Sequence, residues 1–89
     1  MVVTVKFVGV FRSLSGKSKL DLKLAKSTIL REVIKKIVEE CPQLAQVLTN
    51  PKPNMLILIN GKEISVLDGF ETVVKAGDEL VFVPVMHGG

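Results

Sequence analysis

The chain has 89 residues and a mass of 9.7 kDa, the size of one domain with a single hydrophobic core. Hydrophobic residues make up 47% and charged residues 24%, which excludes an intrinsically disordered chain. The single cysteine excludes a disulfide scaffold and an all-cysteine zinc site, and it fits a reducing compartment. The net charge is +3, but the two signs are interspersed and neither Tyr nor Trp is present to stack on a base. We therefore expect no direct binding of nucleic acid.

Membrane insertion and export are not expected either. The longest unbroken apolar run, Met55 to Ile59, is far shorter than the roughly 20 residues that a membrane-spanning helix needs. Lys6 interrupts the apolar stretch near the N-terminus, and no small-residue cleavage site follows it. The sequence thus predicts a cytoplasmic protein without a membrane partner.

The N-terminal half begins with two stretches that alternate with a period of two. Val2 to Arg12 predicts a strand, and one face of it is apolar and buried: Val3, Val5, Phe7 and Phe11. Ser13 to Ser18 is polar, contains Gly16 and predicts a turn. The alternation of Leu20, Leu22 and Leu24 then predicts a second strand that forms a hairpin with the first.

The period changes to three and four residues after Ser27, which predicts a helix with Ser27 as its N-cap. Pro42 ends this helix, because the residue before a proline avoids helical angles. A short turn is expected around Leu44 to Leu48. The apolar side of the helix consists of Ile29, Leu30, Val33, Ile34, Ile37, Val38 and Cys41.

The C-terminal half predicts three more strands. Met55 to Ile59 is a central strand by its continuous apolar character, and Asn60-Gly61 predicts a tight hairpin turn to a short return strand, Lys62 to Ser65. Leu80 to Val85 is the last strand, and we expect it beside the first. The sequence therefore predicts an α+β fold in residues 1–85, with a mixed sheet of four to five strands and one main helix across one face.

No side chains form a recognisable catalytic or metal-binding group. Ser15-Gly16-Lys17-Ser18 looks like the end of a phosphate loop, but Phe11 stands where that loop needs a glycine. Cys41 closes the apolar side of the helix, so a buried structural thiol is favoured over a nucleophile. His87 has no companion ligands for a metal. We expect a protein that is not an enzyme and that holds no metal or bound cofactor.

The end of the chain carries the strongest functional signal. Residues 86–89, Met86-His87-Gly88-Gly89, follow the last strand and predict a flexible arm. Two glycines without a Cβ let such an arm enter a narrow slot and adopt angles closed to other residues. We therefore interpret the domain as a handle and Gly89, with its carboxylate, as the reactive group. Gly88, His87 and Met86 would give a partner enzyme access to it.

Nearly the whole chain resembles the ubiquitin-like sulfur carriers. The motifs that carry the resemblance are Phe11 to Gly16, Ile59-Asn60-Gly61, Ala76 to Val85 and the terminal Gly88-Gly89. This superfamily includes the small subunit of molybdopterin synthase, the sulfur carrier of thiamine biosynthesis, the ubiquitin-related modifier and the small archaeal modifiers. The resemblance implies a ubiquitin-like β-grasp fold.

The resemblance also implies a chemistry and its partners. A ubiquitin-activating-type enzyme would use ATP to adenylate Gly89, and a persulfide donor would convert the adenylate to a thiocarboxylate. The sulfur would serve molybdopterin synthesis, with the large subunit of molybdopterin synthase as partner, or tRNA thiolation. Alternatively, Gly89 would be conjugated to lysines of target proteins. The molybdopterin branch commonly ends with two prolines, whereas this chain has only Pro84 there, and its His87-Gly88-Gly89 ending is more like the ubiquitin-related modifier. No protease is expected to be needed, because no residue follows Gly89.

A docking surface is predicted from the alternation in the first and last strands. Val8 and Val10 should face the same way as Val81 and Val83, away from the core residues Phe7 and Phe82. If the two strands adjoin, these four valines form an exposed apolar patch beside the arm, and we expect it to contact the activating enzyme.

Overall fold

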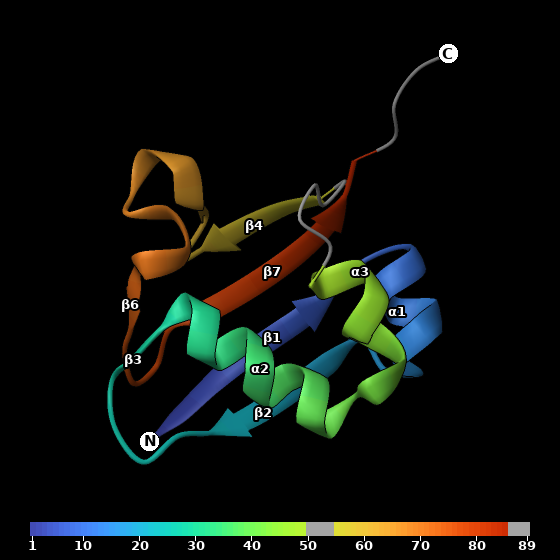
Figure 1. The fold of residues 1–89 in the computed structure, drawn as a ribbon, viewed down its shortest axis with the longest axis horizontal. Coiled ribbons are helices and arrows are strands. Elements are labelled where there is room, and N and C mark those ends of the chain that lie inside the picture. Colours follow the sequence, from blue (N-terminus) through green and yellow to red (C-terminus); the bar gives the residue numbers. More distant parts are fainter. Residues whose placement is uncertain (50–54, 86–89) are drawn as a thin grey trace.

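The computed structural model describes residues 1–49 and 55–85, and its main feature is a mixed sheet (Figure 1). The elements in chain order are β1 (Val2–Phe7), α1 (Val10–Ser15), β2 (Lys19–Lys23), β3 (Thr28–Ile29), α2 (Leu30–Glu40), η1 (Pro42–Leu44), α3 (Ala45–Leu48), β4 (Met55–Ile59), β5 (Lys62–Glu63), η2 (Ile64–Val66), η3 (Gly69–Glu71), β6 (Val73–Val74) and β7 (Glu79–Pro84).

The strands form one five-stranded sheet and one small sheet. The large sheet has the order β2-β1-β7-β4-β5, and β3 pairs with β6 in the small one. β1 and β7 are parallel neighbours, which confirms that the first and last strands adjoin, and the other pairs are antiparallel. Two hairpin-like units, β1–β2 and β4–β5, therefore meet at β7. The expected mixed sheet is confirmed, and β4, predicted as a central strand, is an interior strand between β7 and β5.

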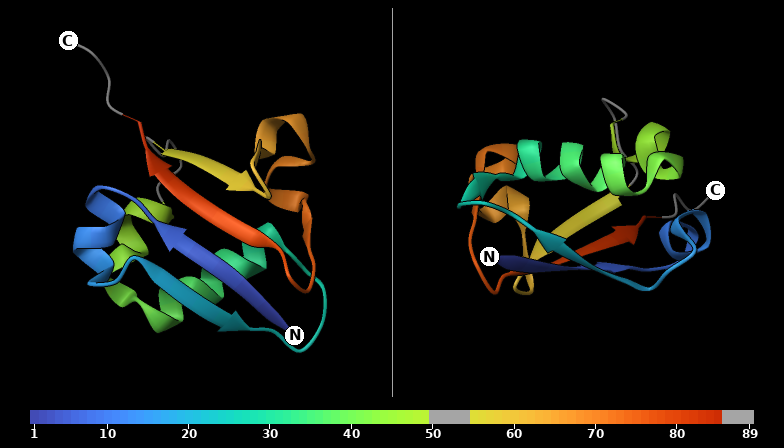
Figure 2. Two further views of the ribbon diagram at one scale, coloured as in Figure 1. Left: turned by 180° about the vertical axis from the view of Figure 1, so that it is seen from behind. Right: turned by 90° about the horizontal axis from the view of Figure 1, so that it is seen from below.

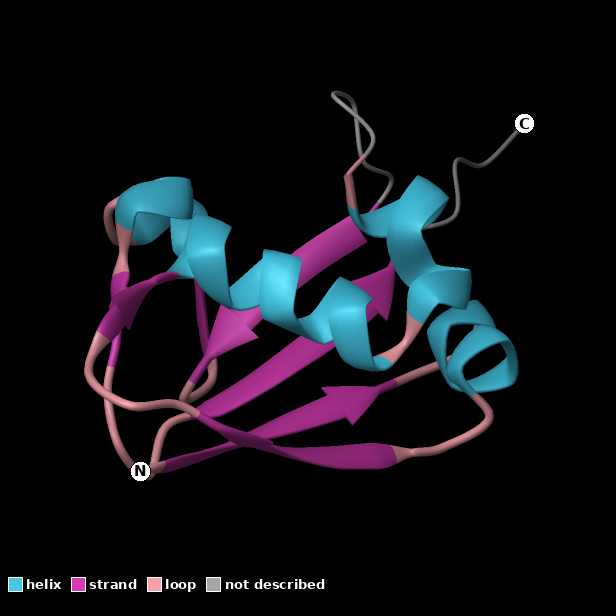
Figure 3. Cartoon of the chain, turned by 60° about the horizontal axis from the view of Figure 1, so that its bottom comes forward, coloured by secondary structure: helices cyan, strands magenta, loops and turns pink. Residues whose placement is uncertain are grey.

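The core lies between the sheet and α2, which crosses one face of it (Figure 3 and the right-hand view of Figure 2). Every third or fourth residue of α2 is apolar, so one side of the helix is buried: Leu30, Val33, Ile34 and Ile37. The sheet meets it with the alternate residues of its strands: Val3, Val5, Phe7, Leu22, Ile57, Ile59, Leu80 and Phe82. The predicted periodicities of helix and strands are thus confirmed.

Phe82 is the largest fully buried side chain in this core, and its ring stacks on Phe7 with centroids 6.3 Å apart. We expect Phe82→Ala to lower the free energy of unfolding by about 3–5 kcal/mol, because it leaves a cavity that the sheet cannot close. Urea denaturation measures the change. Phe70→Ala is the matched control, since 39% of Phe70 is exposed and its loss should cost far less. A change below about 1 kcal/mol for Phe82→Ala would contradict the packing described here.

The start of α2 differs from the prediction of Ser27 as N-cap. Thr28 and Ile29 form β3 and pair with Val74 and Val73, so the first residue of the helix is Leu30. The amide of Leu30 donates to the carbonyl of Thr72 at 2.8 Å. This N–H at the start of the helix therefore needs no side-chain cap as its acceptor. The predicted N-cap at Ser27 is therefore wrong, because a segment distant in sequence supplies the hydrogen-bond acceptor.

The first strand ends earlier than predicted. β1 stops at Phe7, and the segment predicted as its second half forms α1. Gly9 has φ +60° and turns the chain out of the sheet, and its carbonyl accepts hydrogen bonds from the amides of Arg12 and Ser13. Phe11 is buried as predicted, but it reaches the core from α1. The predicted turn at Ser13 to Ser18 is also partly helical, since α1 extends to Ser15.

The second hairpin confirms the predicted Asn60-Gly61 turn, with φ +51° and +83° at these two residues. The Asn60 side chain also accepts from the amide of Glu79 and donates to Asp78 Oδ1, both at 2.9 Å. β5 covers only Lys62–Glu63, shorter than expected, because the chain continues as η2. Hydrogen bonds from the hydroxyl and then from the amide of Ser65 hold the pKa of the Glu63 carboxyl below its ordinary value.

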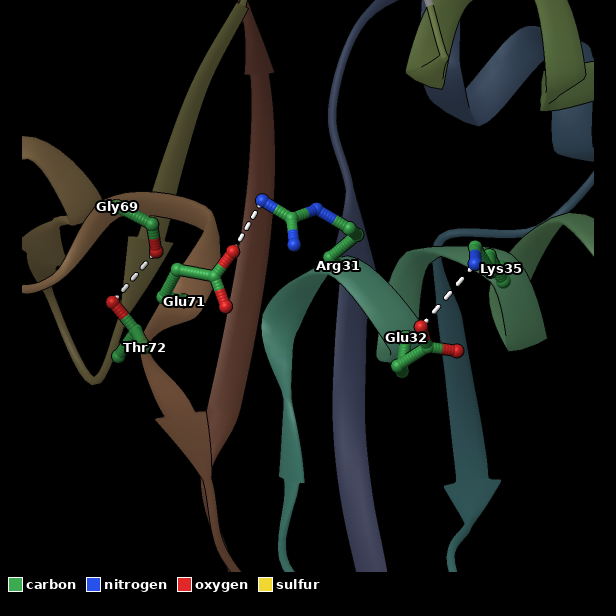
Figure 4. Close-up of polar contacts among 6 residues, drawn as sticks. All are labelled: Arg31, Glu32, Lys35, Gly69, Glu71 and Thr72. Carbon is green, nitrogen blue, oxygen red and sulfur yellow. Dashed lines mark hydrogen bonds and ion pairs between the residues drawn. The ribbon is translucent and has the colours of Figure 1, made fainter.

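Polar contacts join α2 to the segment before β6 (Figure 4). Arg31 of α2 pairs with Glu71 of η3, and the Thr72 hydroxyl donates to the carbonyl of Gly69 at 2.7 Å. A second ion pair, Glu32–Lys35, lies within α2. All four charged side chains are about half exposed, so these pairs contribute little to stability. Over the described ranges, no helix is long and apolar enough to cross a membrane.

Candidate functional site

The strand that leads to the diglycine is the central strand of the sheet. β7 lies between β1 and β4, and both of its core-facing residues, Leu80 and Phe82, have no exposed surface. Burying a side chain of this size stabilises a fold by about 1.5–3 kcal/mol. The last described residue, Val85, is exposed and directly follows this strand. The domain therefore fixes the chain up to Pro84, four residues before Gly88.

The predicted reactive group and its access residues lie outside the described part of the chain. These are Gly89, Gly88, His87 and Met86. Their roles, and the predicted flexible arm of residues 86–89, remain predictions from the sequence. What the structure contributes is the fixed end to which they are attached, on the same end of the sheet as α1 (Figure 1).

The face of the sheet opposite α2 carries an apolar patch around the end of β7. Val81 and Val83 alternate with the buried Leu80 and Phe82, so they point to the opposite face. In the antiparallel register, Leu58 of β4 lies beside Val81 and Leu56 beside Val83. Leu56 is 42% exposed, and the other three are half-buried. We call this set the outer apolar patch: Leu56, Leu58, Val81 and Val83.

Charged residues border the outer apolar patch on the side of β1. Lys6 lies beside Val81 in the parallel register, and its Nζ is 3.1 Å from Oε2 of Glu79. Both side chains of this ion pair are nearly half exposed. An apolar centre with a charged rim is the usual anatomy of a protein-binding surface.

The predicted patch of four valines is only half correct. Val81 and Val83 lie on one face as expected, but Val8 follows the end of β1 and Val10 is the first residue of α1. Both are exposed, at 44% and 49%, yet neither continues the strand on which the prediction placed it. The sequence did contain a signal for this break, since a glycine inside a strand pattern, here Gly9, marks a bulge or an end.

Leu56 and Leu58 were missed as members of the outer apolar patch. The unbroken apolar run of β4 indicated a strand buried on both faces. In the structure only its core-facing residues Ile57 and Ile59 are buried. The available signal was that β4 contains no polar residue, so whichever of its faces is exposed must be apolar and could bind a partner.

The structure places two other chemical candidates, Cys41 and the segment around Gly16, as the sequence predicted. Cys41 is buried, 1% exposed, next to the end of α2, as predicted for a structural thiol. Gly16 is followed by β2 and not by a helix, so the segment is no phosphate loop. It lines a shallow surface hollow together with the basic residues Arg12, Lys17 and Lys19. In the parts of the chain that are described, no three His, Cys, Asp or Glu residues are grouped as metal ligands.

The comparison with protein families decides the relationship. The model of the ThiS family matches residues 5–89, which is nearly the whole chain and includes the diglycine. The chain belongs to the ThiS family. It is therefore a member of the ubiquitin-like sulfur carrier superfamily, as its motifs indicated.

Individual relatives span this chain from end to end. Ubiquitin-related modifier 1 of Schizosaccharomyces pombe is 32% identical over 97 residues, with 100% of both chains covered. The solution structure of small archaeal modifier protein 1 from Methanosarcina acetivorans has a TM-score of 0.82 and 28% identity, and the match covers 99% of this chain and 96% of that one. Such neighbours confirm the predicted β-grasp fold.

One similar structure is a complex of two proteins. It contains subunits 1 and 2 of the molybdopterin-converting factor from Helicobacter pylori, and the matched chain has a TM-score of 0.63 and 25% identity, with 100% of both chains covered. Members of this superfamily are thus known as modifiers and as a subunit of a larger assembly.

Proposed function

We propose that this protein is a ubiquitin-like sulfur carrier, not itself a catalyst, whose Gly89 carboxyl group is activated by a partner enzyme and converted to a thiocarboxylate. The observation that carries the proposal is the ThiS family match through residue 89, which includes Gly88 and Gly89. A rigid β7 that ends at Pro84, five residues before the carboxyl group, fits a domain that presents its own terminus.

The chemistry requires activation, because a carboxylate resists nucleophilic attack. A carboxylate oxygen of Gly89 attacks the α-phosphorus of ATP in the activating enzyme, and pyrophosphate leaves. The terminal sulfur of a persulfide donor then attacks the carbonyl carbon, and AMP leaves. A thiol cleaves the sulfur–sulfur bond of the resulting acyl disulfide, so that a thiocarboxylate and a new disulfide remain. No group of the folded domain has to donate or accept an electron pair in these steps.

Geometry restricts where the activating enzyme can dock. An extended chain spans at most about 3.3–3.6 Å per residue, so the Gly89 carboxyl group lies within roughly 20 Å of Val83. An enzyme that holds this carboxyl group must therefore cover the neighbourhood of the last strand. The outer apolar patch is an apolar surface at this place, and we propose that it docks the activating enzyme.

The sulfur acceptor is proposed from the chain end. A single proline, Pro84, and the His87-Gly88-Gly89 ending favour tRNA thiolation over molybdopterin synthesis as the destination of the sulfur. The identity of 32% to a ubiquitin-related modifier points the same way. We place the protein and its activating enzyme in the cytoplasm.

Intact-mass spectrometry tests the proposal directly. The chain is incubated with ATP, the activating enzyme of the same organism and a persulfide donor. We expect a mass increase equal to the exchange of one oxygen for sulfur, and fragmentation should locate the change at Gly89. Omission of ATP is the control and should leave the mass unchanged. An unchanged mass in the complete mixture, together with no ATP–pyrophosphate exchange, would overturn the proposal.

A second candidate function is conjugation of Gly89 to lysines of target proteins, which the names of the similar modifiers favour. The two candidates leave different products. Conjugation leaves residues 76–89 attached to the target lysine after trypsin digestion, because Lys75 is the last cleavage site of the chain. Sulfur carriage leaves no such remnant.

A further inference from the structure

Gly9, between β1 and α1, has a backbone conformation that only glycine adopts readily. Its φ is +60° and its ψ is −128°, outside the left-handed helical region that other residues visit occasionally. Its carbonyl accepts hydrogen bonds from the amides of Arg12 at 3.1 Å and Ser13 at 3.2 Å. Gly9 is thus the point at which the chain leaves the sheet and starts α1.

Gly9 also touches the end of β7. A Cβ built on Gly9 would lie 2.9 Å from Cγ of Pro84 and 3.6 Å from Cδ, so any side chain would push the proline ring away. The other glycines with positive φ in the described residues have open space around the same position: Gly16, Gly61, Gly69 and Gly77. At these four positions glycine is favoured only by the positive φ angle of the backbone. Gly9 is distinguished by the close approach of Pro84.

The strand register explains why these two residues meet. The parallel ladder between β1 and β7 ends with Phe7 beside Phe82, and two further steps would place Gly9 beside Pro84. The ladder cannot continue there, because Gly9 turns into α1 and Pro84 has no N–H to donate. A packing contact therefore replaces the hydrogen bonds at the last residue of β7. On its other side, Pro84 is paired with Met55 of β4.

We infer that the Gly9–Pro84 contact is a positioning device, which sets the point and the direction in which the chain leaves the sheet toward Gly89. The inference rests on the proposed function, since it matters only if a partner enzyme must receive the Gly89 carboxyl group. Pro84 is the last residue of the sheet, so a displacement of its ring moves the origin of everything that follows. Gly9 and Pro84 do not touch the reacting atoms. They act by setting the direction of the chain that follows Pro84.

The test is a double-mutant cycle. The variants are Gly9→Ala, Pro84→Ala and the combination of both. Gly16→Ala is the matched control, because it also places an alanine at positive φ, at the other end of α1, but with no atom within 4 Å of the new Cβ. The same activating enzyme is used with every variant, and ATP–pyrophosphate exchange gives kcat and the KM for the carrier. Denaturation curves give the folded fraction of each variant.

We expect Gly9→Ala to lower kcat at least tenfold with KM changed by less than about threefold, because a misplacement of about 1 Å can cost roughly 100-fold and the docking face is intact. Pro84→Ala should lower kcat more modestly. In the Pro84→Ala background, Gly9→Ala should have little further effect on kcat, since the ring that it displaces is gone. A merely structural role would lower stability in both backgrounds and leave kcat of the folded fraction unchanged.

A measurement without the enzyme keeps this inference separable from the proposed function. Residual dipolar couplings report the orientation of the Val85 N–H relative to the sheet. They should change in Gly9→Ala, with the couplings of β1 and β4 preserved, and should not change in Gly16→Ala. Unchanged Val85 couplings, or an unchanged kcat for Gly9→Ala, would overturn the positioning role and leave the carrier function standing. Failure of the wild-type chain to be adenylated would instead overturn the proposed function.

Discussion

Val83→Asp is expected to lower the rate of Gly89 adenylation by at least about 100-fold while the fold is retained. In the free protein the new carboxylate would stay in contact with water, because Val83 faces away from the core and is half-buried. In the docked complex it would be an unpaired charge within an apolar contact, which costs several kcal/mol. Since each 1.4 kcal/mol is a factor of ten, a loss of this size follows.

Val66→Asp is the matched control for this prediction. Val66 is 73% exposed and lies in η2, which follows β5 near the first residues of β7 and not near Pro84. Val66→Asp introduces the same charge outside the outer apolar patch, so adenylation should proceed as in the unmodified chain. ATP–pyrophosphate exchange gives the rate, and the amide spectrum confirms the fold. Normal adenylation of Val83→Asp, or an equal loss in both variants, would contradict the proposed docking surface.

A second copy of the chain is the competing occupant of the outer apolar patch. Light scattering of the eluting protein distinguishes the two. If the unmodified chain is a dimer and Val83→Asp is a monomer, the patch is a self-interface and not the site that docks the enzyme. A monomer in both cases leaves the patch free for the activating enzyme.

The fold was predictable from the sequence to the extent that hydrophobic periodicity determines it. A period of two identified β1, β2 and β7, and a period of three to four identified α2, because in each case burial of one face is the main stabilising term. The Asn60-Gly61 turn was predictable for a local reason, since few residue pairs adopt two positive φ angles. The adjacency of β1 and β7 followed from their shared need for burial.

The errors arose where contacts between distant segments override the local pattern. Ser27 was a reasonable N-cap by composition, but the carbonyl of Thr72, far along the chain, accepts the hydrogen bond from Leu30. The segment from Gly9 to Arg12 keeps apparent alternation, yet the close approach of Pro84 and the turn at Gly9 leave no room for a longer strand. Gly9 itself was a local signal for the end of the strand, but the contacts with Thr72 and Pro84 have no signature in a window of neighbouring residues.

The candidate site was predictable to a different degree. The diglycine could be identified as a candidate because its proposed chemistry depends on the two residues themselves and not on the fold. The outer apolar patch is legible only in part, since membership of a sheet surface depends on which strands are neighbours. Val81 and Val83 were found from the alternation of β7, whereas Leu56 and Leu58 required the register between β4 and β7.

Deletion of Gly88 and Gly89 is the second change with a large expected effect. It should abolish adenylation and sulfur transfer completely, because the shortened chain presents the carboxyl group of His87 two residues too early and without the narrow glycine segment. Intact-mass spectrometry and ATP–pyrophosphate exchange measure the loss. The free energy of unfolding should not change, since residues 1–85 contain the whole described sheet and core.

The same deletion separates a carrier from a plain interaction domain with the same fold, which would need no chemistry at its terminus. Binding of the activating enzyme is measured for the full and the shortened chain by calorimetry. If the protein is a carrier that docks through the outer apolar patch, the shortened chain should retain most of its affinity for the enzyme and lose all turnover. In Val83→Asp the affinity for the enzyme should itself be lost. Two results would show that Gly89 is not the reactive group and that the domain acts by binding alone. One is adenylation of the shortened chain, and the other is that removal of Gly88 and Gly89 changes no reaction of the partner.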